Sequence, residues 1–114
     1  MCGGRIVATN LEETIRYSEL LMLYQGLLSP TQKDILEDYF SYNLSISEIA
    51  ENRNISRAAV EDAIKKGKKK LDQFEDELGS LKALEVIHEI KSNTNDEQIT
   101  SKLDEVERIM KHVI

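Results

Sequence analysis

The sequence predicts an all-α protein in which a helix-turn-helix head is followed by a long helix and a C-terminal helical hairpin. Three observations support this fold class. Apolar residues recur at spacings of three and four over most of the chain, which is the period of an amphipathic helix. Residues of strong helix propensity fill the positions between them. No segment of strand length alternates apolar and polar residues.

The first expected helix covers residues 11–28, and the second runs from about Pro30 to Tyr42. Proline disfavours helix at the residue before it and suits the first helical position, so Pro30 separates the two. The Ser29 hydroxyl can cap the second helix, and Gln32 can reach back to it. The residues expected to face inward are Leu11, Ile15, Leu20, Leu21, Leu23, Tyr24, Leu27 and Leu28, then Ile35, Leu36, Tyr39 and Phe40.

The segment from Ser45 to Leu71 predicts a helix-turn-helix. Ser45 and Glu48 have the spacing of a capping box, in which each side chain accepts a hydrogen bond from the other residue's backbone N–H. A support helix of about two turns follows and packs through one face. The residues on that face are Ile46, Ile49 and Ala50.

The turn and the second helix of this motif follow directly. Residues 52–54 include types that tolerate turn conformations, and Ser56 is placed to cap the next helix. We expect Ile55 and Val60 to enter the core and to fix the angle between the two helices. The start of the second helix is then free to enter a nucleic-acid groove.

The long helix carries an apolar seam at positions 64, 67, 71, 74, 78 and 81, with a slip in phase beyond Leu81. Gly79 is expected to bend or end this helix. The seam residues Leu71, Phe74, Leu78 and Leu81 fit two interpretations, packing within the chain or a dimer contact. We favour a homodimer, because so long an apolar face needs more cover than a short head provides.

A polar break at residues 92–95 precedes a last amphipathic helix, which Thr94 or Asn95 can cap. The chain therefore ends in a helical hairpin. We treat residues 1–10 as a flexible N-terminus and residues 11–114 as a single helical domain, with the helix-turn-helix at about 45–71 and the helical extension at about 72–114.

The net charge of −6 argues against a protein that coats nucleic acid indiscriminately. The charge is unevenly distributed, however. The basic segment from Arg53 to Lys70 holds seven basic and two acidic residues, which leaves eight basic and nineteen acidic residues elsewhere. A positive segment therefore lies on an acidic body. No apolar run is long enough to cross a membrane and no export signal is present, so we expect a cytoplasmic protein.

The sequence offers little support for catalysis, a cofactor or a metal site. Cys2 is the only cysteine, and His88 and His112 lack a second ligand at a helical offset. There is no glycine-rich phosphate loop, no nucleophile with a placed base and no His-Glu metal motif. We therefore predict a protein that is not an enzyme and needs no cofactor.

Two parts of the sequence together resemble the small bacterial YlxM-type family: Leu28-Ser29-Pro30-Thr31-Gln32-Lys33 through Tyr39, then Ser45 to Glu51 with Ile55 to Val60. That family is in turn similar to the fourth, promoter-reading region of sigma factors. The resemblance implies a helical, DNA-binding or regulatory protein. It also implies a link to the signal recognition particle pathway, which rests on gene neighbourhood with the GTPases of the particle.

By this resemblance the recognition helix covers Ser56 to about Lys66. The residues implied to face a groove are Arg57, Ala58, Glu61 and Asp62, and those implied to lie near phosphates, with Arg53, are Lys65, Lys66, Lys68, Lys69 and Lys70. Glu61 and Asp62 depart from a good DNA reader, because phosphate repels carboxylates. Ordinary ion pairs of Glu61 with Lys65 and of Asp62 with Lys66 would leave the remaining lysines unpaired locally.

The leading hypothesis is a DNA-binding regulatory protein, homodimeric and cytoplasmic, that acts in the signal recognition particle pathway. The alternative is an adaptor that does not bind DNA. In that case the motif is a packing scaffold, and the chain engages protein or ribonucleoprotein components of the protein-targeting machinery. Glu61 and Asp62 favour the alternative, whereas the basic segment favours the first hypothesis.

Overall fold

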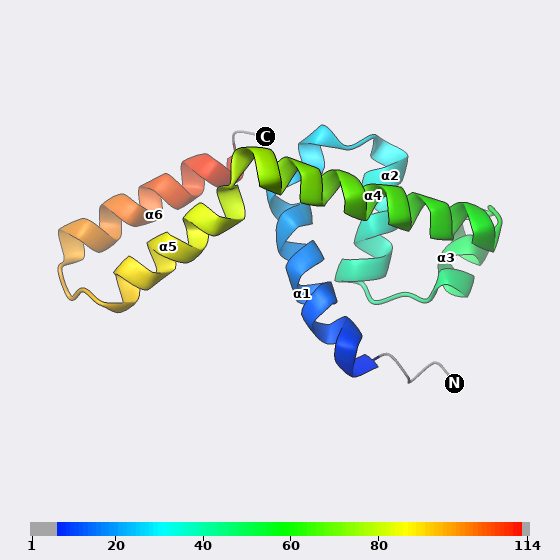
Figure 1. Cartoon of the computed structure of the whole chain (residues 1–114), viewed down its shortest axis with the longest axis horizontal. Coiled ribbons are helices and arrows are strands. Elements are labelled where there is room, and N and C mark those ends of the chain that lie inside the picture. Colours follow the sequence, from blue (N-terminus) through cyan, green and yellow to red (C-terminus); the bar gives the residue numbers. More distant parts are fainter. Residues whose placement is uncertain (1–6, 113–114) are drawn as a thin grey trace.

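The computed structural model describes residues 7–112, and the side chains of residues 11–111 within them. The elements in chain order are α1 (Val7–Tyr24), η2 (Gln25–Leu27), α2 (Pro30–Leu36), η3 (Glu37–Ser41), α3 (Ile46–Arg53), α4 (Arg57–Leu78), α5 (Ser80–Ser92) and α6 (Glu97–His112). All of these elements are helical, and the described residues contain no strand (Figure 1). The predicted all-α fold with a C-terminal hairpin is therefore confirmed.

The molecule is elongated, and α4 lies along its long axis (Figure 1). It measures 52 × 29 × 23 Å, with a radius of gyration of 16.6 Å against about 13 Å for a compact chain of this length. The extra length has a clear origin. Helices α1 to α3 pack beside α4, whereas the α5–α6 hairpin extends from the C-terminal end of α4 (Figure 1).

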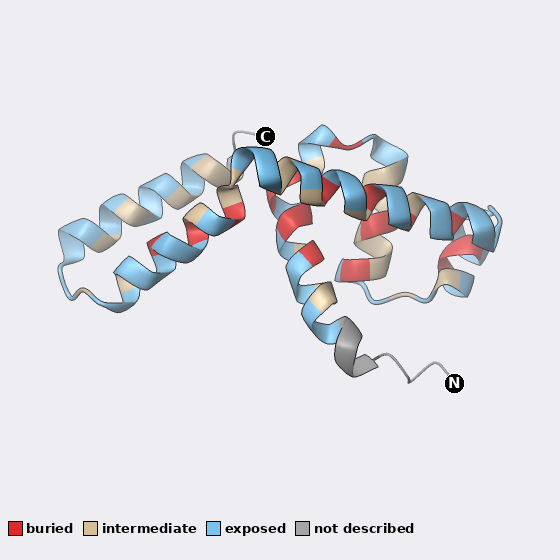
Figure 2. Ribbon diagram, viewed as in Figure 1, coloured by how far each residue is buried: buried red, intermediate tan, exposed pale blue. Residues whose placement is uncertain are grey.

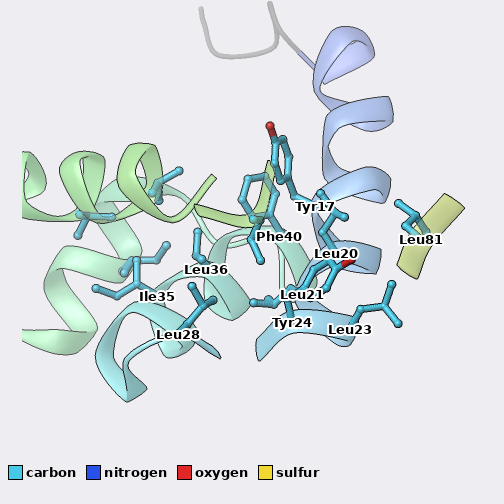
Figure 3. Packing of buried hydrophobic residues seen from close by; sticks show 14 of the residues in the cluster. Tyr17, Leu20, Leu21, Leu23, Tyr24, Leu28, Ile35, Leu36, Phe40 and Leu81 are labelled. Carbon is cyan, nitrogen blue, oxygen red and sulfur yellow. The ribbon is translucent and has the colours of Figure 1, made fainter. Parts of the chain in front are cut away.

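The core of the head lies where α1, α2, η3 and α4 meet (Figures 2 and 3). Leu20, Leu36 and Leu71 are fully buried there. At Gly67 a Cβ atom would lie 2.5 Å from Leu36 Cδ1, so the missing side chain lets α2 pack closely against α4. The gap that Gly67 leaves in the seam is filled by a side chain of the same chain.

The structure covers some residues of the predicted seam and leaves another exposed. Leu71 and Leu81 are buried, and Phe74 packs against the core with its ring 5.9 Å from that of Tyr24. Leu78, by contrast, is 55% exposed. The seam therefore packs largely within the chain, and Figure 3 shows Leu81 of α5 extending toward α1.

Local signals placed most helix ends correctly. Ser29 accepts a hydrogen bond from the Gln32 N–H and Ser56 from the Ala59 N–H, and Ser45 forms the predicted capping box. Gly79 ends α4 in the left-handed region, with φ of 67°. The cap of α6 was wrong, however. Asp96, and neither Thr94 nor Asn95, accepts from the N–H groups of Gln98 and Ile99.

The first helix departs from the prediction in two ways. It begins at Val7 rather than Leu11, and the remaining residues of the predicted flexible N-terminus, 1–6, lie outside the described residues. Leu11, Ile15 and Leu27 were expected to be buried but are exposed. The physical reason for the first two is that the N-terminal half of α1 extends past the head (Figure 1).

The second helix contains a turn of π-helix, η3, that the sequence did not reveal. The Phe40 carbonyl, near the end of this turn, accepts a hydrogen bond from the Ser18 hydroxyl at 3.0 Å, which joins η3 to α1. The ring of Phe40 also stacks on Tyr17, with centroids 5.2 Å apart. No helix within residues 7–112 combines the length and apolar character that crossing a membrane requires.

Candidate nucleic-acid interface

The helix-turn-helix is formed by α3, a turn at residues 54–56 and the first half of α4. Asn54 takes a left-handed conformation, with φ of 55°, and the Ile55 N–H donates to the Ala50 carbonyl at 3.0 Å. Val60 is fully buried against α3 and α2 neighbours in the core. Ile55 is 38% exposed, so its expected place in the core was wrong. The turn is fixed by backbone hydrogen bonds and Val60 instead.

The predicted groove-facing residues lie on the exposed side of α4. Ser56 uses its hydroxyl as the helix cap, so this oxygen is already occupied by the Ala59 N–H at 3.0 Å. The exposed residues from here to the middle of α4 are Arg57, Ala58, Ala59, Glu61, Asp62, Lys65, Lys66, Lys69 and Lys70. Their opposite face is covered through Val60, Ile64 and Gly67.

Two of the predicted phosphate-binding residues pair with acids of other elements. Arg53 donates from Nε to Asp38 Oδ2 at 2.6 Å, a hydrogen bond that raises the pKa of the Arg53 guanidinium. Lys68 lies 3.0 Å from Glu13 Oε1, and its ammonium sits 5.2 Å from the centroid of the Tyr17 ring. Part of the charge of these two side chains is therefore neutralised before any ligand arrives.

The other basic residues are less constrained. Lys66 pairs with Asp62 at 3.1 Å, as the local spacing predicted, and Lys70 donates to the neutral Gln32 at 3.3 Å. Within the described residues, the expected ion pair of Glu61 with Lys65 is not formed, and Arg57 and Lys69 also have no carboxylate within 4.0 Å. These positive charges remain available to a ligand.

Two hollows lie along this surface. The first, which we call the junction pocket, has a volume of about 210 Å³. It is lined by Tyr39, Ile46, Glu61, Ile64, Lys65 and Lys68. The second has a volume of about 500 Å³ and continues along α4, sharing Lys65 and Lys68 with the first. Its other lining residues are Tyr17, Lys69, Asp72, Gln73 and Asp76.

Comparison with known proteins places the chain in a family. The family described as "Putative helix-turn-helix protein, YlxM / p13 like", UPF0122, matches residues 11–113. The chain belongs to the UPF0122 family. It is 38% identical over 104 residues to a UPF0122 protein of Fusobacterium nucleatum, a match that covers 91% of this chain and 94% of that relative.

Two further relatives support the assignment. A UPF0122 protein of Malacoplasma penetrans is 40% identical over 90 residues, covering 79% of this chain and 84% of that protein. The UPF0122 protein YlxM of Bacillus subtilis is 33% identical over 108 residues, covering 88% and 98% respectively. The resemblance drawn from the sequence is thus confirmed, and the helix-turn-helix is the feature that names the family.

This UPF0122 chain also contains polar contacts that the sequence reasoning missed, at the acidic end of α4. The Tyr17 hydroxyl donates to Asp72 Oδ2 at 2.7 Å, and the Tyr24 hydroxyl donates to Glu75 Oε1 at 2.7 Å. Burial, and then the bond to Asp72, raise the pKa of Tyr17 to about 12.

No side-chain cluster of the described residues has the makeup of a metal centre. The described histidine side chain, His88, lies with Nε2 3.8 Å from Glu107 on the hairpin. The side chain of His112 lies outside the described residues. The open basic face of α4 and the junction pocket beside it form the candidate nucleic-acid interface of this UPF0122 protein.

Proposed function

We propose that this UPF0122 protein is a cytoplasmic DNA-binding regulator without catalytic activity, which contacts DNA through the exposed start of α4. One observation carries the proposal. Arg57, Lys65 and Lys69 lie on the exposed face of a helix-turn-helix and have no carboxylate within 4.0 Å among the described residues. Phosphate neutralisation by such open cations is the main source of affinity for nucleic acid.

The contacts of the basic segment indicate that its residues contribute unequally to phosphate binding. Arg57, Lys65 and Lys69 supply most of the phosphate contacts, together with Lys66 and Lys70. Arg53 and Lys68 contribute less, because their pairs with Asp38 and Glu13 are less exposed to solvent than the pair of Lys66 with Asp62. Glu61 and Asp62 lower the affinity for duplex DNA, since carboxylates near phosphates are repelled. We therefore propose binding of modest affinity that depends on salt.

We also propose a homodimer, since helix-turn-helix proteins commonly bind two half-sites through a two-fold axis. Leu71, Phe74 and Leu81 are covered within the chain, so the seam position available to a second copy is Leu78. Light scattering of the wild type and of Leu78→Asp tests this proposal. A dimer that Leu78→Asp converts to monomer supports it, and a monomeric wild type at high concentration contradicts it.

The DNA proposal is tested by fluorescence anisotropy with a random duplex across a salt series. We expect log Kd to change linearly with log salt, and the slope to fall when Lys65, Lys66, Lys68, Lys69 and Lys70 are replaced by Ala. A sharper comparison uses Lys65→Ala/Lys69→Ala against Lys82→Ala/Lys102→Ala. Both pairs change the net charge equally, but only the first lies on the proposed interface. Equal binding by the two double variants would contradict the proposal.

A second function is favoured by the hairpin. Val86, Ile90, Ile99, Val106 and Ile109 are each at least 41% exposed on α5 and α6, an apolar surface suited to a protein partner. This alternative is an adaptor of the signal recognition particle machinery that does not bind DNA. Binding of purified components of the particle, lost in Val106→Asp/Ile109→Asp and retained in Lys65→Ala/Lys69→Ala, would support it. Recovery of no targeting component by the wild type would count against it.

A further inference from the structure

The junction pocket has a chemical character that the phosphate contacts do not explain. We propose that it binds the base of an unpaired guanine in a single-stranded segment of nucleic acid. This inference rests on the proposed function, because it assigns a base to the surface whose lysines are proposed to hold phosphates. It goes further by naming the type of nucleotide and the residues that select it.

The size and floor of the pocket suit one base. Its volume of about 210 Å³ is below the roughly 300 to 1,000 Å³ of sites for drug-sized ligands. Ile46 and Ile64 line it with apolar surface, and Tyr39 adds an aromatic ring. Phosphate gains nothing from such a surface, whereas an unstacked base recovers stacking and apolar contact on it.

The charged groups of the pocket are one carboxylate, Glu61, and the ammonium groups of Lys65 and Lys68. Glu61 and Lys65 are four residues apart on α4, the spacing at which Asp62 and Lys66 form an ion pair at 3.1 Å. Among the described residues, Glu61 and Lys65 make no such pair. A carboxylate and an ammonium with no partner among the described residues therefore both line the pocket.

Guanine is the base whose Watson–Crick edge complements this arrangement. Its N1–H and N2 amino group are adjacent donors that can engage the two oxygens of one carboxylate, and its O6 can accept from the Lys65 ammonium. Adenine and cytosine place a ring-nitrogen acceptor beside the amino group. Uracil and thymine place carbonyls on both sides of the N–H. Each of these four bases would direct a lone pair at Glu61.

The guanine must be unpaired, because in a duplex the same edge is already bonded to cytosine. The adjoining hollow gives the flanking phosphates a place to lie. It shares Lys65 and Lys68 with the junction pocket and adds Lys69. A strand can thus run along α4 with one base turned into the pocket and its backbone against the lysines.

The test compares guanosine with inosine, which keeps N1–H and O6 and lacks only the amino group. Labelled single strands of about twelve uridines, with one central guanosine or inosine, are titrated with the full-length protein by fluorescence anisotropy. We expect the guanosine strand to bind about tenfold more tightly, the effect of one charge-assisted hydrogen bond. Glu61→Gln should bind both strands alike and keep the salt dependence. Asp62→Asn, a neighbouring exposed carboxylate outside the pocket, should keep the preference.

The outcomes separate this proposal from the proposed function. Equal binding of the two strands by the wild type, or a preference that survives in Glu61→Gln, overturns the guanine pocket. Salt-dependent binding of the random duplex, titrated in parallel with the same protein, leaves the proposed function standing. If the wild-type protein shows no salt-dependent binding to the single strands or to the duplex, both the guanine pocket and the proposed function are overturned. Circular dichroism of Glu61→Gln verifies folding, which an exposed substitution should not disturb.

Discussion

The two halves of α4 differ in charge and in what their charged side chains do. From Arg57 to Lys70 the helix is basic and its outer face is open, whereas from Leu71 to Leu78 it carries Asp72, Glu75, Asp76 and Glu77. Asp72 and Glu75 are bonded to tyrosines of α1. A single helix therefore presents exposed positive charge at one end and, at the other, forms hydrogen bonds that join it to α1.

The difference shows that charge alone does not identify function in this chain. Lys68 and Lys69 are both lysines, but the Lys68 ammonium lies against Glu13 and the Tyr17 ring, so Lys68 also stabilises the structure. What separates the two roles is whether a partner of opposite charge lies within reach in the folded chain. The predictions below test that distinction, starting with the largest expected effect.

Replacing Leu71 by Ala should produce the largest loss. Leu71 is fully buried where α1, α2 and α4 meet, so we expect the free energy of unfolding to fall by about 2–5 kcal/mol. The matched control is Leu11→Ala, a leucine of α1 that is 60% exposed and should change stability by about 0.5 kcal/mol or less. Urea denaturation measures both. Similar losses would mean that Leu71 contributes no more to the core than an exposed leucine does.

Replacing Glu75 by Gln should loosen the junction between the head and the hairpin. Glu75 accepts hydrogen bonds from the Tyr24 hydroxyl and from the N–H groups of Leu81 and Lys82 at the start of α5. We expect the free energy of unfolding, measured by urea denaturation, to fall by about 1–3 kcal/mol. Hydrogen exchange in the first turn of α5 should become faster. The control is Glu77→Gln, an exposed neighbour on α4. If both variants unfold like the wild type, the contacts of Glu75 do not stabilise the junction.

The stability at high pH should depend on Tyr17. Its pKa in the folded protein is raised to about 12 from an ordinary value near 10, so the protonated form stabilises the fold below pH 10 and this contribution is lost between pH 10 and 12. We expect about 1 kcal/mol less stability at pH 11 than at pH 9. Tyr17→Phe should remove part of that decrease, since Tyr24 also has a raised pKa. An unchanged decrease in Tyr17→Phe would contradict the assignment.

The residues that could be predicted from the sequence are those whose partners are close along the chain. The caps at Ser29, Ser45 and Ser56 each involve a residue three positions away, so local spacing sufficed. The role of Asp96 was not predicted because Thr94, Asn95 and Asp96 are adjacent polar residues, and the local pattern does not show which of them caps α6. The contacts of Tyr17 and Lys68 join residues 55 positions apart, and no local pattern records such a contact.

The candidate interface divides in the same way. Its exposed face followed from helical periodicity, and so did the pair of Asp62 with Lys66. The pairing of Arg53 with Asp38 did not, because it depends on how η3 meets the end of α3. The junction pocket was also beyond the sequence, since Tyr39, Ile46 and Glu61 come from three different elements.

The smallest expected effect is the difference between two arginines in binding. Arg57→Ala should lower the salt dependence of duplex binding by about one counterion, because Arg57 has no carboxylate within 4.0 Å among the described residues. Arg53→Ala should lower it less, since the Arg53 guanidinium is already hydrogen-bonded to Asp38.

Asp38→Asn then provides the decisive comparison. If Asp38 limits the contribution of Arg53, Asp38→Asn should increase the salt dependence of duplex binding. In the Asp38→Asn background, Arg53→Ala should then lower that salt dependence as much as Arg57→Ala does. An identical slope for all of these variants would show that pairing within the chain does not decide which cations meet DNA.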